Sequence, residues 1–474
     1  MKRFLLFSLV SLFILQAGAS TVAGFFGKDR YKHATISVCV RNINTGKTLE
    51  SMNKSQAVVP ASVMKLITTA TAMELLGPNH RFKTVVQSKG KIIDGVLSGD
   101  IYIIGGGDPS LGSRRFGSDQ YAFLNEWAEA ISKAGIKVVN GNVIADPGLF
   151  DDEHVSPYWM WEDMGNYYAA GIYGLGVFDN SYQLKLRSGS VGTRPEVLSV
   201  TPPMPGMTID NQLVAADNDK DSAYIYGAPY QWNRSLFGTI PANRSSFSIR
   251  GDMPDPPYFA AYLLCEALIR KGIEVKGQPM STHSMPENYI QQKPVTDICS
   301  TLSVSLLKMI DVIHARSDNF YTEYLLRHIS LTASDKPASA RNGLMVIRDF
   351  WEQKGLDVSS LYMADGCGLS PMNRVSAGFL TELLEYMAIK SKYADIYEKS
   401  LPLAGVQGSV SGFLKGTKLE GKIRLKSGSM QGVNSYAGYY HKNGQIYVVV
   451  MMANHLHMTG SKVCSDMEDF LLSL

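Results

Sequence analysis

The chain has 474 residues, of which 45% are hydrophobic and 19% are charged, and its formal net charge is +3. This composition is typical of a globular protein with two or three domains and enough apolar residues for a sizeable core. Without Lys2 and Arg3 of the N-terminal segment, 44 basic residues stand against 43 acidic ones. That balance argues against nucleic acid binding or strong membrane electrostatics as the basis of function.

The first 19 residues have the pattern of a secretory signal. Lys2 and Arg3 precede an apolar run over 4–15, and Ala17-Gly18-Ala19 has the small-x-small form that signal peptidase cuts. The apolar run is too short to span a bilayer, and no later stretch is long and apolar enough to do so. We therefore expect residues 1–19 to be removed. The mature protein should be exported to the periplasm or cell envelope, without a stable membrane span.

Five scattered cysteines do not indicate a disulfide framework in a chain of this size. They are Cys39, Cys265, Cys299, Cys367 and Cys464, and no Cys-x-x-Cys pair occurs among them. A zinc ribbon or a thioredoxin-like site is therefore not expected, and we predict neither a metal nor another cofactor.

The N-terminal part of the mature chain predicts a β-hairpin followed by a buried helix. Residues 33–40 alternate as a strand does, 44–47 form a turn and 48–50 return. A helix then opens at Ser62 and runs to Leu76, where Gly77-Pro78 ends it.

From about residue 82 the pattern changes to short strands joined by Gly-rich turns, with one helix over 119–134. An aromatic cluster at 158–173 indicates a packed core or, alternatively, one wall of a binding cleft. Residues 180–250 are again β-like, with Pro and Gly at the turns.

The remainder alternates helices with strongly patterned strands. Helices are expected at 256–272, 303–313, 320–329, 375–389 and 458–472, antiparallel strands at 423–428, 435–440 and 445–452, and a polar surface excursion at 277–294. We predict an α+β domain built from 20–81 and 254–474. Its antiparallel sheet would take strands from both chain ends, and a large β-rich insertion, 82–253, would interrupt it.

Ser62 and Lys65 are the candidate catalytic pair. Residues three apart on a helix share a face, so the Lys65 amine can reach the Ser62 hydroxyl. An amine whose pKa is lowered can act as the base for a serine nucleophile. The same Ser-x-x-Lys spacing also occurs at Ser51 and Ser305, in contexts that fit catalysis less well.

Two further motifs follow in order, Ser317-Asp318-Asn319 and Lys426-Ser427-Gly428. Each has a structural interpretation by itself, as a helix-capping turn and as the end of a strand beside a turn. In this order and context, the three motifs resemble the active-site set of penicillin-recognising serine enzymes.

Acyl transfer explains the set. Ser62 would attack and Lys65 would take its proton, while the Ser317 hydroxyl relays a proton to the leaving amine. Asn319 would hold Lys65 and a substrate carbonyl. Lys426 would add a second cation that lowers the Lys65 pKa and attracts a substrate carboxylate.

Substrate would lie along the strand that carries Lys426. Gly428 would let its backbone approach that strand, and the N–H groups of Ser62 and Ser429 would hold the oxyanion. The hydroxyl of Ser427 stands where related enzymes usually have Thr.

Over nearly its whole mature length the chain resembles class C low-molecular-mass penicillin-binding proteins, the D-alanyl-D-alanine carboxypeptidase/endopeptidase family of the penicillin-binding protein 4 type. The resemblance lies in the blocks 315–321, 365–370, 401–406 and 426–439, and in the insertion between the first two motifs. It implies a penicillin-binding transpeptidase/β-lactamase-like fold and hydrolysis of peptidoglycan stem peptides through a Ser62 acyl-enzyme. It also implies acylation by β-lactam antibiotics.

The resemblance also implies substrate contacts outside the motifs. Gln431 would meet the peptide stem, and Asp146 would bind the free amine of a diamino acid in a pocket lined by Phe150. Cys367 stands in place of a Ser and Pro371 in place of a substrate-binding Arg.

Rival functions share parts of this pattern. A β-lactamase would use the same motifs, but no segment resembles its deacylation loop. A Cys-His hydrolase at Cys367, or a zinc peptidase using His455 and His457, lacks recognisable partners. A non-catalytic wall-binding scaffold would not need Ser62 and both lysines.

Overall fold

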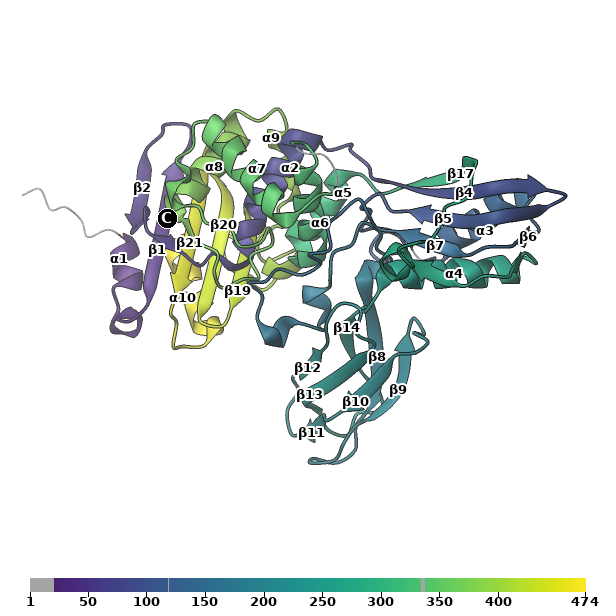
Figure 1. The fold of residues 1–474 in the computed structure, drawn as a ribbon. Coiled ribbons are helices and arrows are strands. Elements are labelled where there is room, and N and C mark those ends of the chain that lie inside the picture. The colour runs from purple at the N-terminus through teal and green to yellow at the C-terminus, as the bar shows by residue number, and fades with distance from the viewer. Residues whose placement is uncertain (1–20, 118, 334–336) are drawn as a thin grey trace, which may run out of the picture.

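The computed structural model describes residues 21–117, 119–333 and 337–474, so the expected signal segment lies outside the described residues. Three parts are visible (Figure 1). We call them the helix–sheet unit (21–81 and 303–474), the arm (83–146 and 256–302) and the lobe (181–252). A segment over 147–180 connects the arm to the lobe.

The helix–sheet unit is built on a five-stranded sheet in the order β19-β20-β21-β1-β2. Its strands are β1 (Thr35–Asn42), β2 (Thr48–Met52), β19 (Ile423–Met430), β20 (Val433–Lys442) and β21 (Gln445–Asn454). All neighbouring pairs are antiparallel. The prediction of one sheet with strands from both chain ends is confirmed, and β19 lies at its edge.

Helices cover both faces of this sheet. On one face, α1 (Thr21–Phe26) and α10 (Gly460–Ser473) pack in a cluster with Val38, Val449 and Met451. The other face carries α2 (Lys65–Leu76), α5 (Leu306–Arg316), α6 (Asn319–Ser330), α7 (Ala340–Gln353), α8 (Ala377–Ile389) and α9 (Ala394–Ser400). A short ladder of β3 (Ala57–Val58) and β18 (Val375–Ser376) joins the two segments that flank α2 and α8.

Helix α2 is the centre of the second face. Every residue from Lys65 to Met73 is buried, which requires its polar groups to find partners inside the protein. Thr69 and Thr71 do so by donating to the carbonyls of Lys65 and Ile67, at 2.7 and 2.8 Å.

The arm is a seven-stranded sheet with helices α3 (Ala122–Lys133) and α4 (Pro256–Arg270) in the same hydrophobic cluster. Its strands are β4 (Lys83–Ile93), β5 (Val96–Ile104), β6 (Val138–Val139), β7 (Val143–Asp146), β15 (Glu274–Val275), β16 (Pro279–Ser281) and β17 (Val295–Leu302). β17 pairs antiparallel with β4, about two hundred residues earlier. The chain therefore returns to the helix–sheet unit near residue 303, later than the boundary at 254 expected from the sequence.

The lobe consists of two small sheets, as the β-like pattern of 180–250 predicts. One contains β8 (Ser181–Arg187), β9 (Glu196–Thr201) and β14 (Phe247–Asp252), and the other contains β10 (Thr208–Asn211), β11 (Val214–Ala216), β12 (Ser222–Tyr226) and β13 (Asn233–Pro241). Their inner residues, such as Leu184 and Leu236, join the hydrophobic cluster of the arm.

Two further features bear on the sequence predictions. The five cysteines are free thiols. In the described part of the chain, no helix has the length and apolar character needed to cross a membrane.

Candidate active site

Ser62 lies in a 3₁₀ turn, η2 (Ala61–Met64), that leads directly into α2. The predicted helix therefore begins with a tighter turn. Ala61 has φ of 48°, an unfavourable left-handed conformation for a residue with a side chain. The Lys65 amine is 3.0 Å from the Ser62 hydroxyl oxygen, so the expected pairing is present.

The Lys65 ammonium uses its three donors on three different segments. Besides Ser62, it donates to Asn319 Oδ1 at 2.6 Å and to the backbone carbonyl of Cys367 at 2.5 Å. The side chain is fully buried, and this desolvation lowers the pKa of Lys65, although neighbouring carboxylates such as Asp365 oppose the effect. The structure thus holds an amine that loses its proton more readily than a free lysine beside the candidate nucleophile.

Ser317 and Asn319 are placed by the junction of α5 and α6. α5 ends at Arg316, and Ser317 follows in a left-handed conformation with φ of 57°. Asp318 then caps α6, because its carboxylate accepts the backbone N–H of Tyr321 at 3.1 Å. Asn319 reaches Lys65 and donates its amide to the carbonyl of Tyr168 at 2.8 Å.

Lys426, on the edge strand β19, also lies beside Ser317. Its amine donates to the Ser317 hydroxyl at 2.9 Å and to the carbonyl of Ser427 at 2.6 Å. Burial and the positive charge of Lys65 lower the pKa of Lys426 well below its ordinary value. The three motifs therefore meet, as the sequence predicted, in a network of two buried amines and two hydroxyls.

Gly428 is needed for a reason that the sequence analysis did not give. A Cβ there would lie 2.8 Å from the Pro60 carbonyl oxygen and 2.9 Å from the Ser62 nitrogen. Strand β19 can therefore approach the Ser62 turn closely only without a side chain at this position.

The other predicted substrate residues of β19 lie along its open edge. Ser427 is partly buried and its hydroxyl is 2.7 Å from that of Ser409. Ser429 and Gln431 are exposed, Gln431 in the turn between β19 and β20.

Asp146 and Phe150 lie on other parts of the chain than β19, at the end of the arm and in the connecting segment. Asp146 ends β7, accepts the backbone N–H of Gly148 at 3.0 Å and interacts electrostatically with Lys89 of the arm. Phe150 is 4% exposed and its ring meets Tyr324 and His328 edge-on. Phe150 is thus a core residue between the connecting segment and α6, not the wall of an open pocket.

The loop over 365–370 is the main part of the site whose role the sequence did not predict. Its Asp365 carboxylate is buried and accepts the backbone N–H groups of Gly368 and Ser370, each at 2.6 Å. It also accepts the Trp159 indole at 2.9 Å and the Asn373 amide at 2.9 Å. These bonds fix the loop that presents the Cys367 carbonyl to Lys65.

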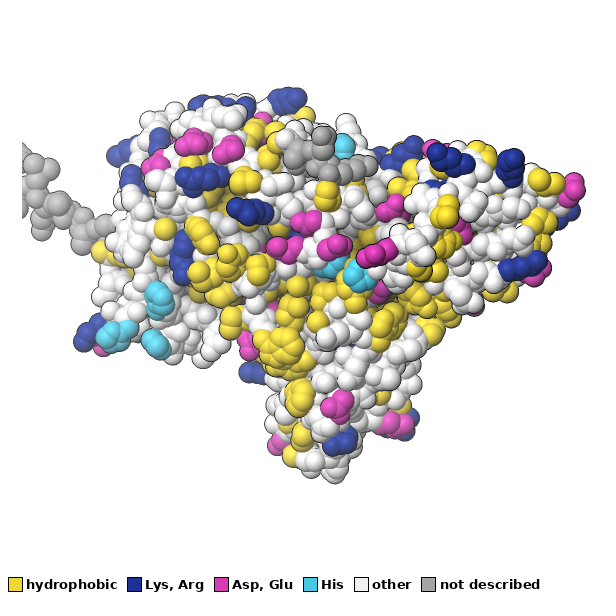
Figure 2. Space-filling model, in the orientation of Figure 1, with side chains coloured by type: hydrophobic (Ala, Val, Ile, Leu, Met, Phe, Trp, Pro, Cys, Tyr) yellow, Lys and Arg dark blue, Asp and Glu magenta, His cyan; other side chains and the backbone are white. Residues whose placement is uncertain are grey.

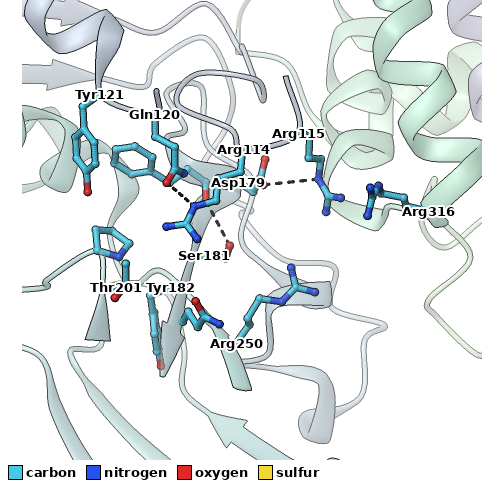
Figure 3. A pocket seen from close by; sticks show the side chains of 13 residues that line it. Arg114, Arg115, Gln120, Tyr121, Asp179, Ser181, Tyr182, Thr201, Arg250 and Arg316 are labelled. Atoms are coloured by element: carbon cyan, nitrogen blue, oxygen red, sulfur yellow. Dashed lines mark hydrogen bonds and ion pairs between the residues drawn. The ribbon is translucent and has the colours of Figure 1, made fainter. Parts of the chain in front are cut away.

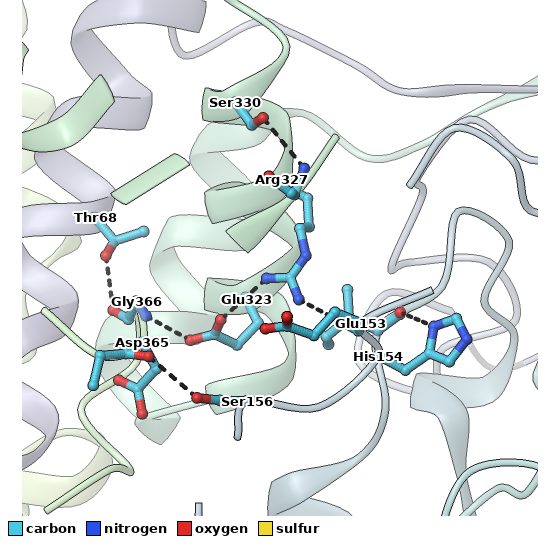
Figure 4. A network of polar contacts seen from close by, with 12 residues as sticks. Thr68, Glu153, His154, Ser156, Glu323, Arg327, Ser330, Asp365 and Gly366 are labelled. Carbon is cyan, nitrogen blue, oxygen red and sulfur yellow. Dashed lines mark hydrogen bonds and ion pairs between the residues drawn. The ribbon is translucent and has the colours of Figure 1, made fainter. Parts of the chain in front are cut away.

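Glu323 of α6 supports the same loop (Figure 4). Its carboxylate accepts the backbone N–H of Gly366 at 2.8 Å and lies 3.6 Å from Arg327, while Thr68 of α2 donates to the Gly366 carbonyl at 2.7 Å. Burial raises the pKa of Glu323 to about 7. The network ties α2, α6 and the loop into one rigid support.

This network also bears on two rival sites. The side chains of Glu323, Asp365 and Cys367 lie within 4.8 Å of one another, but the two carboxylates already accept hydrogen bonds from the loop, so we assign the cluster to its support. Burial raises the pKa of the Cys367 thiol well above its ordinary value, which disfavours a thiolate nucleophile. His455 and His457, the zinc candidates, are exposed after β21.

The predicted aromatic cluster is partly a packed core and partly exposed, so each of its two interpretations fits some of its residues. Trp159 and Tyr173 are buried, whereas Tyr158 and Trp161 are 47% and 67% exposed. Figure 2 shows hydrophobic side chains gathered on the face where the three parts of the molecule meet.

Comparison with known proteins assigns this arrangement to a family. The D-Ala-D-Ala carboxypeptidase 3 (S13) family matches residues 20–473. The chain belongs to this family. The resemblance found in the sequence is therefore confirmed.

Curated relatives agree with the S13 assignment. A D-alanyl-D-alanine carboxypeptidase of Actinomadura sp. (strain R39) is 29% identical over 426 residues, which cover 86% of this chain and 75% of the relative. The D-alanyl-D-alanine carboxypeptidase DacB of Haemophilus influenzae is 25% identical over 411 residues, covering 86% and 82%.

Among solved structures, penicillin binding protein 4 (dacB) of Haemophilus influenzae superposes with a TM-score of 0.80 at 23% identity. The match covers 95% of this chain and 98% of that one. The same protein complexed with a novel β-lactam gives 0.73 at 22% identity over 93% and 95%. These likenesses establish the S13 chain's fold as that of penicillin binding protein 4.

Proposed function

We propose that this member of the S13 family hydrolyses the D-Ala-D-Ala bond of peptidoglycan stem peptides through an acyl-enzyme on Ser62. The observation that carries the proposal is the 3.0 Å contact between the Ser62 hydroxyl and a buried lysine whose pKa is lowered. A serine hydroxyl is a weak nucleophile until a base within hydrogen-bond reach removes its proton.

The first half-reaction follows from the contacts. Neutral Lys65 takes the proton of Ser62 as its oxygen attacks the carbonyl carbon of the penultimate D-Ala. The carbonyl oxygen becomes an anion, which the backbone N–H groups of Ser62 and Ser429 would stabilise; the close approach of β19 to the Ser62 turn supports this role. Collapse of this intermediate breaks the peptide bond and leaves an ester on Ser62.

The departing amine must receive a proton before it leaves. The Ser317 hydroxyl stands 2.9 Å from Lys426 and can pass a proton from the lysine pair to the amine. In the second half-reaction, water loses a proton to the same pair and attacks the ester, which frees Ser62 and the shortened peptide.

The rest of the substrate would lie along the open edge of β19. Ser427, Gly428 and Ser429 offer backbone groups for an added strand, and Gln431 at the following turn would meet the peptide stem. Lys426 would attract the terminal carboxylate. A β-lactam, whose strained amide takes the place of the peptide bond, would acylate Ser62 in the same way.

We further propose that the protein works outside the cytoplasm, in the periplasm or cell envelope. The charged start, apolar run and small-x-small site of residues 1–19 support this location, and peptidoglycan is found there.

Replacing Ser62 by Ala tests the nucleophile. The variant should be folded but should neither bind labelled penicillin covalently nor release D-Ala from a stem peptide, as mass spectrometry of the protein and of the products would show. Covalent labelling that persists in Ser62→Ala would place the nucleophile elsewhere. In the unaltered protein, a penicilloyl adduct that hydrolyses within seconds would favour a β-lactamase over a peptidase, and labelling without peptide cleavage would favour a wall-binding scaffold.

Asp146 is proposed to bind the free amine of the diamino acid. If so, Asp146→Asn should weaken cleavage of stem peptides that carry this amine, because a neutral amide attracts an ammonium group less than a carboxylate does. Peptides with the amine acetylated serve as the control. An equal loss on both kinds of peptide would remove Asp146 from recognition.

A further inference from the structure

A continuous cleft runs from the Ser317-Asp318-Asn319 motif onto the arm and the lobe. Its inner hollow, with a volume of about 260 Å³, is lined by Ser317 and Asn319. Its outer hollow, with a volume of about 320 Å³, reaches Thr201 and Pro202 of the lobe. The two hollows share Arg115, Asp179, Ser181, Arg250 and Arg316. A ligand bound beside Ser317 can therefore extend into the outer hollow.

Four arginines converge on this cleft, Arg114, Arg115, Arg250 and Arg316 (Figure 3). They come from the arm, the lobe and the end of α5. Two carboxylates, Asp179 and Asp318, lie close to Arg115, at 3.7 and 2.6 Å. The charge of Arg115 is therefore compensated within the protein.

The charges of the other three guanidinium groups are not compensated by a carboxylate of the described residues. Arg114 donates to the neutral side chain of Gln120 at 2.5 Å, and Arg250 lies 3.6 Å above the ring of Tyr167. Over the described residues, no carboxylate pairs with Arg114, Arg250 or Arg316. All three side chains are exposed, so they can meet a ligand without breaking an ion pair.

We propose that this arginine cleft binds a free carboxylate of the peptide substrate, remote from the bond that is cut. This inference rests on the proposed function. A guanidinium group matches a carboxylate with two parallel hydrogen bonds, and Arg250 lies over the ring of Tyr167, which favours a fixed position of its guanidinium group.

The favoured substrate class is a branched or cross-linked wall peptide rather than a linear dipeptide. Arg316 directly precedes Ser317 and both line the inner hollow, so a peptide at Ser317 would pass beside Arg316. A linear dipeptide ends at Lys426 and has no further carboxylate to place in the outer hollow. A cross-linked peptide carries a second stem whose free carboxylate can reach it.

The test compares two cross-linked stem peptides that differ only in that remote carboxylate, free in one and amidated in the other. The unaltered enzyme should show a KM roughly tenfold lower for the free carboxylate, the factor expected from one charge-assisted hydrogen bond. The difference should shrink at high salt, because exposed charges are screened. In the double variant Arg250→Gln/Arg316→Gln, the two peptides should have equal KM values.

Arg244→Gln is the matched control, because Arg244 is an exposed arginine of the lobe that pairs with Asp219 and does not line the cleft. It should keep the tenfold preference. The rate of acylation by benzylpenicillin, which has no second stem, should be the same in Arg244→Gln and in the unaltered enzyme.

The outcomes separate this inference from the proposed function. Equal KM values for the two peptides in the unaltered enzyme would overturn the arginine cleft while leaving Ser62 chemistry intact. Inhibition by inorganic phosphate that depends on Arg250 and Arg316, without discrimination between the peptides, would overturn it in favour of a phosphate ligand. An enzyme that benzylpenicillin fails to acylate would instead contradict the proposed function itself.

Discussion

In the proposed reaction, two lysines set the chemistry at the scale of single residues. Lys65 and Lys426 are both fully buried and both contact motif hydroxyls. Two ammonium groups in one dry site repel each other, so the pair gives up a proton more easily than either lysine would in water. The Asp365 and Glu323 carboxylates nearby oppose the lowering of the Lys65 pKa. One neutral amine and one cation are what acyl transfer to and from Ser62 requires.

The pH dependence of acylation follows from the lowered lysine pKa values. Only the neutral form of Lys65 can accept the Ser62 proton, so the rate should rise with pH as the lysine pair loses a proton. Because burial lowers the pKa of Lys65, the midpoint of this rise should lie below the value of about 10.4 for a free lysine. Stopped-flow measurement of penicillin acylation from pH 5 to 10 gives the midpoint. A midpoint at or above that of free lysine would mean that Lys65 is not the base.

At the scale of elements, the site depends on where helices and strands end. Helix α5 ends at Arg316 and α6 begins at Asn319. Between them, Ser317 adopts a left-handed conformation that turns its hydroxyl to Lys426. Strained backbone of this kind persists where the surrounding packing enforces it. The strained backbone at this junction therefore costs some stability, and it places the Ser317 hydroxyl beside Lys426.

Two substitutions at Ser317 separate strain from chemistry. Ser317→Gly removes the hydroxyl and relieves the left-handed backbone at φ of 57°, whereas Ser317→Ala removes the hydroxyl and keeps the strain. Peptide cleavage should fall roughly a hundredfold or more in both variants, since proton transfer to the leaving amine is lost. In urea denaturation, Ser317→Gly should be more stable than Ser317→Ala by about 1 kcal/mol. Full cleavage activity in either variant would exclude the hydroxyl relay, and a less stable glycine variant would exclude the strain.

The elements that could be predicted from the sequence are those with a local signal. The hairpin of β1 and β2, helix α2 and the alternating strands β19 to β21 all have regular patterns, and their motifs predicted the core of the site. Strand β17 has no such signal, because most of its residues are exposed or partly buried and its partner β4 is about two hundred residues away. The boundary at 254 was misplaced for that reason.

The same distinction applies to the site residues. Ser62 and Lys65 are three residues apart, so helix geometry predicts their contact. The Cys367 carbonyl that holds Lys65 is a backbone atom, and no side-chain pattern marks it. Glu323 and Asp365 support it from 42 positions apart in the sequence, through a loop whose shape depends on tertiary hydrogen bonds.

At the scale of the whole molecule, the inserted part is anchored to the helix–sheet unit rather than merely tethered to it. Phe150, Ala170 and Ile172 of the connecting segment belong to the hydrophobic cluster of that unit. Arg327 of α6 donates to the carbonyl of Glu153 at 2.9 Å, and Asn319 donates to that of Tyr168. One wall of the cleft is thus fixed relative to Ser62, which a recognition surface on the arm and lobe requires.

Phe150 tests this anchoring. Phe150→Ala would leave a cavity between Tyr324 and His328, and loss of a buried phenylalanine costs about 3–5 kcal/mol. Phe237→Ala, at a lobe residue that is 46% exposed, is the control and should change the unfolding free energy by less than about 1 kcal/mol. Urea denaturation measures both changes, and penicillin acylation per folded molecule should stay normal in both variants, since neither ring contacts a motif residue. If Phe150→Ala instead kept its stability and raised the KM for peptides with a diamino acid, Phe150 would be a pocket residue and the anchoring would have to come from its neighbours.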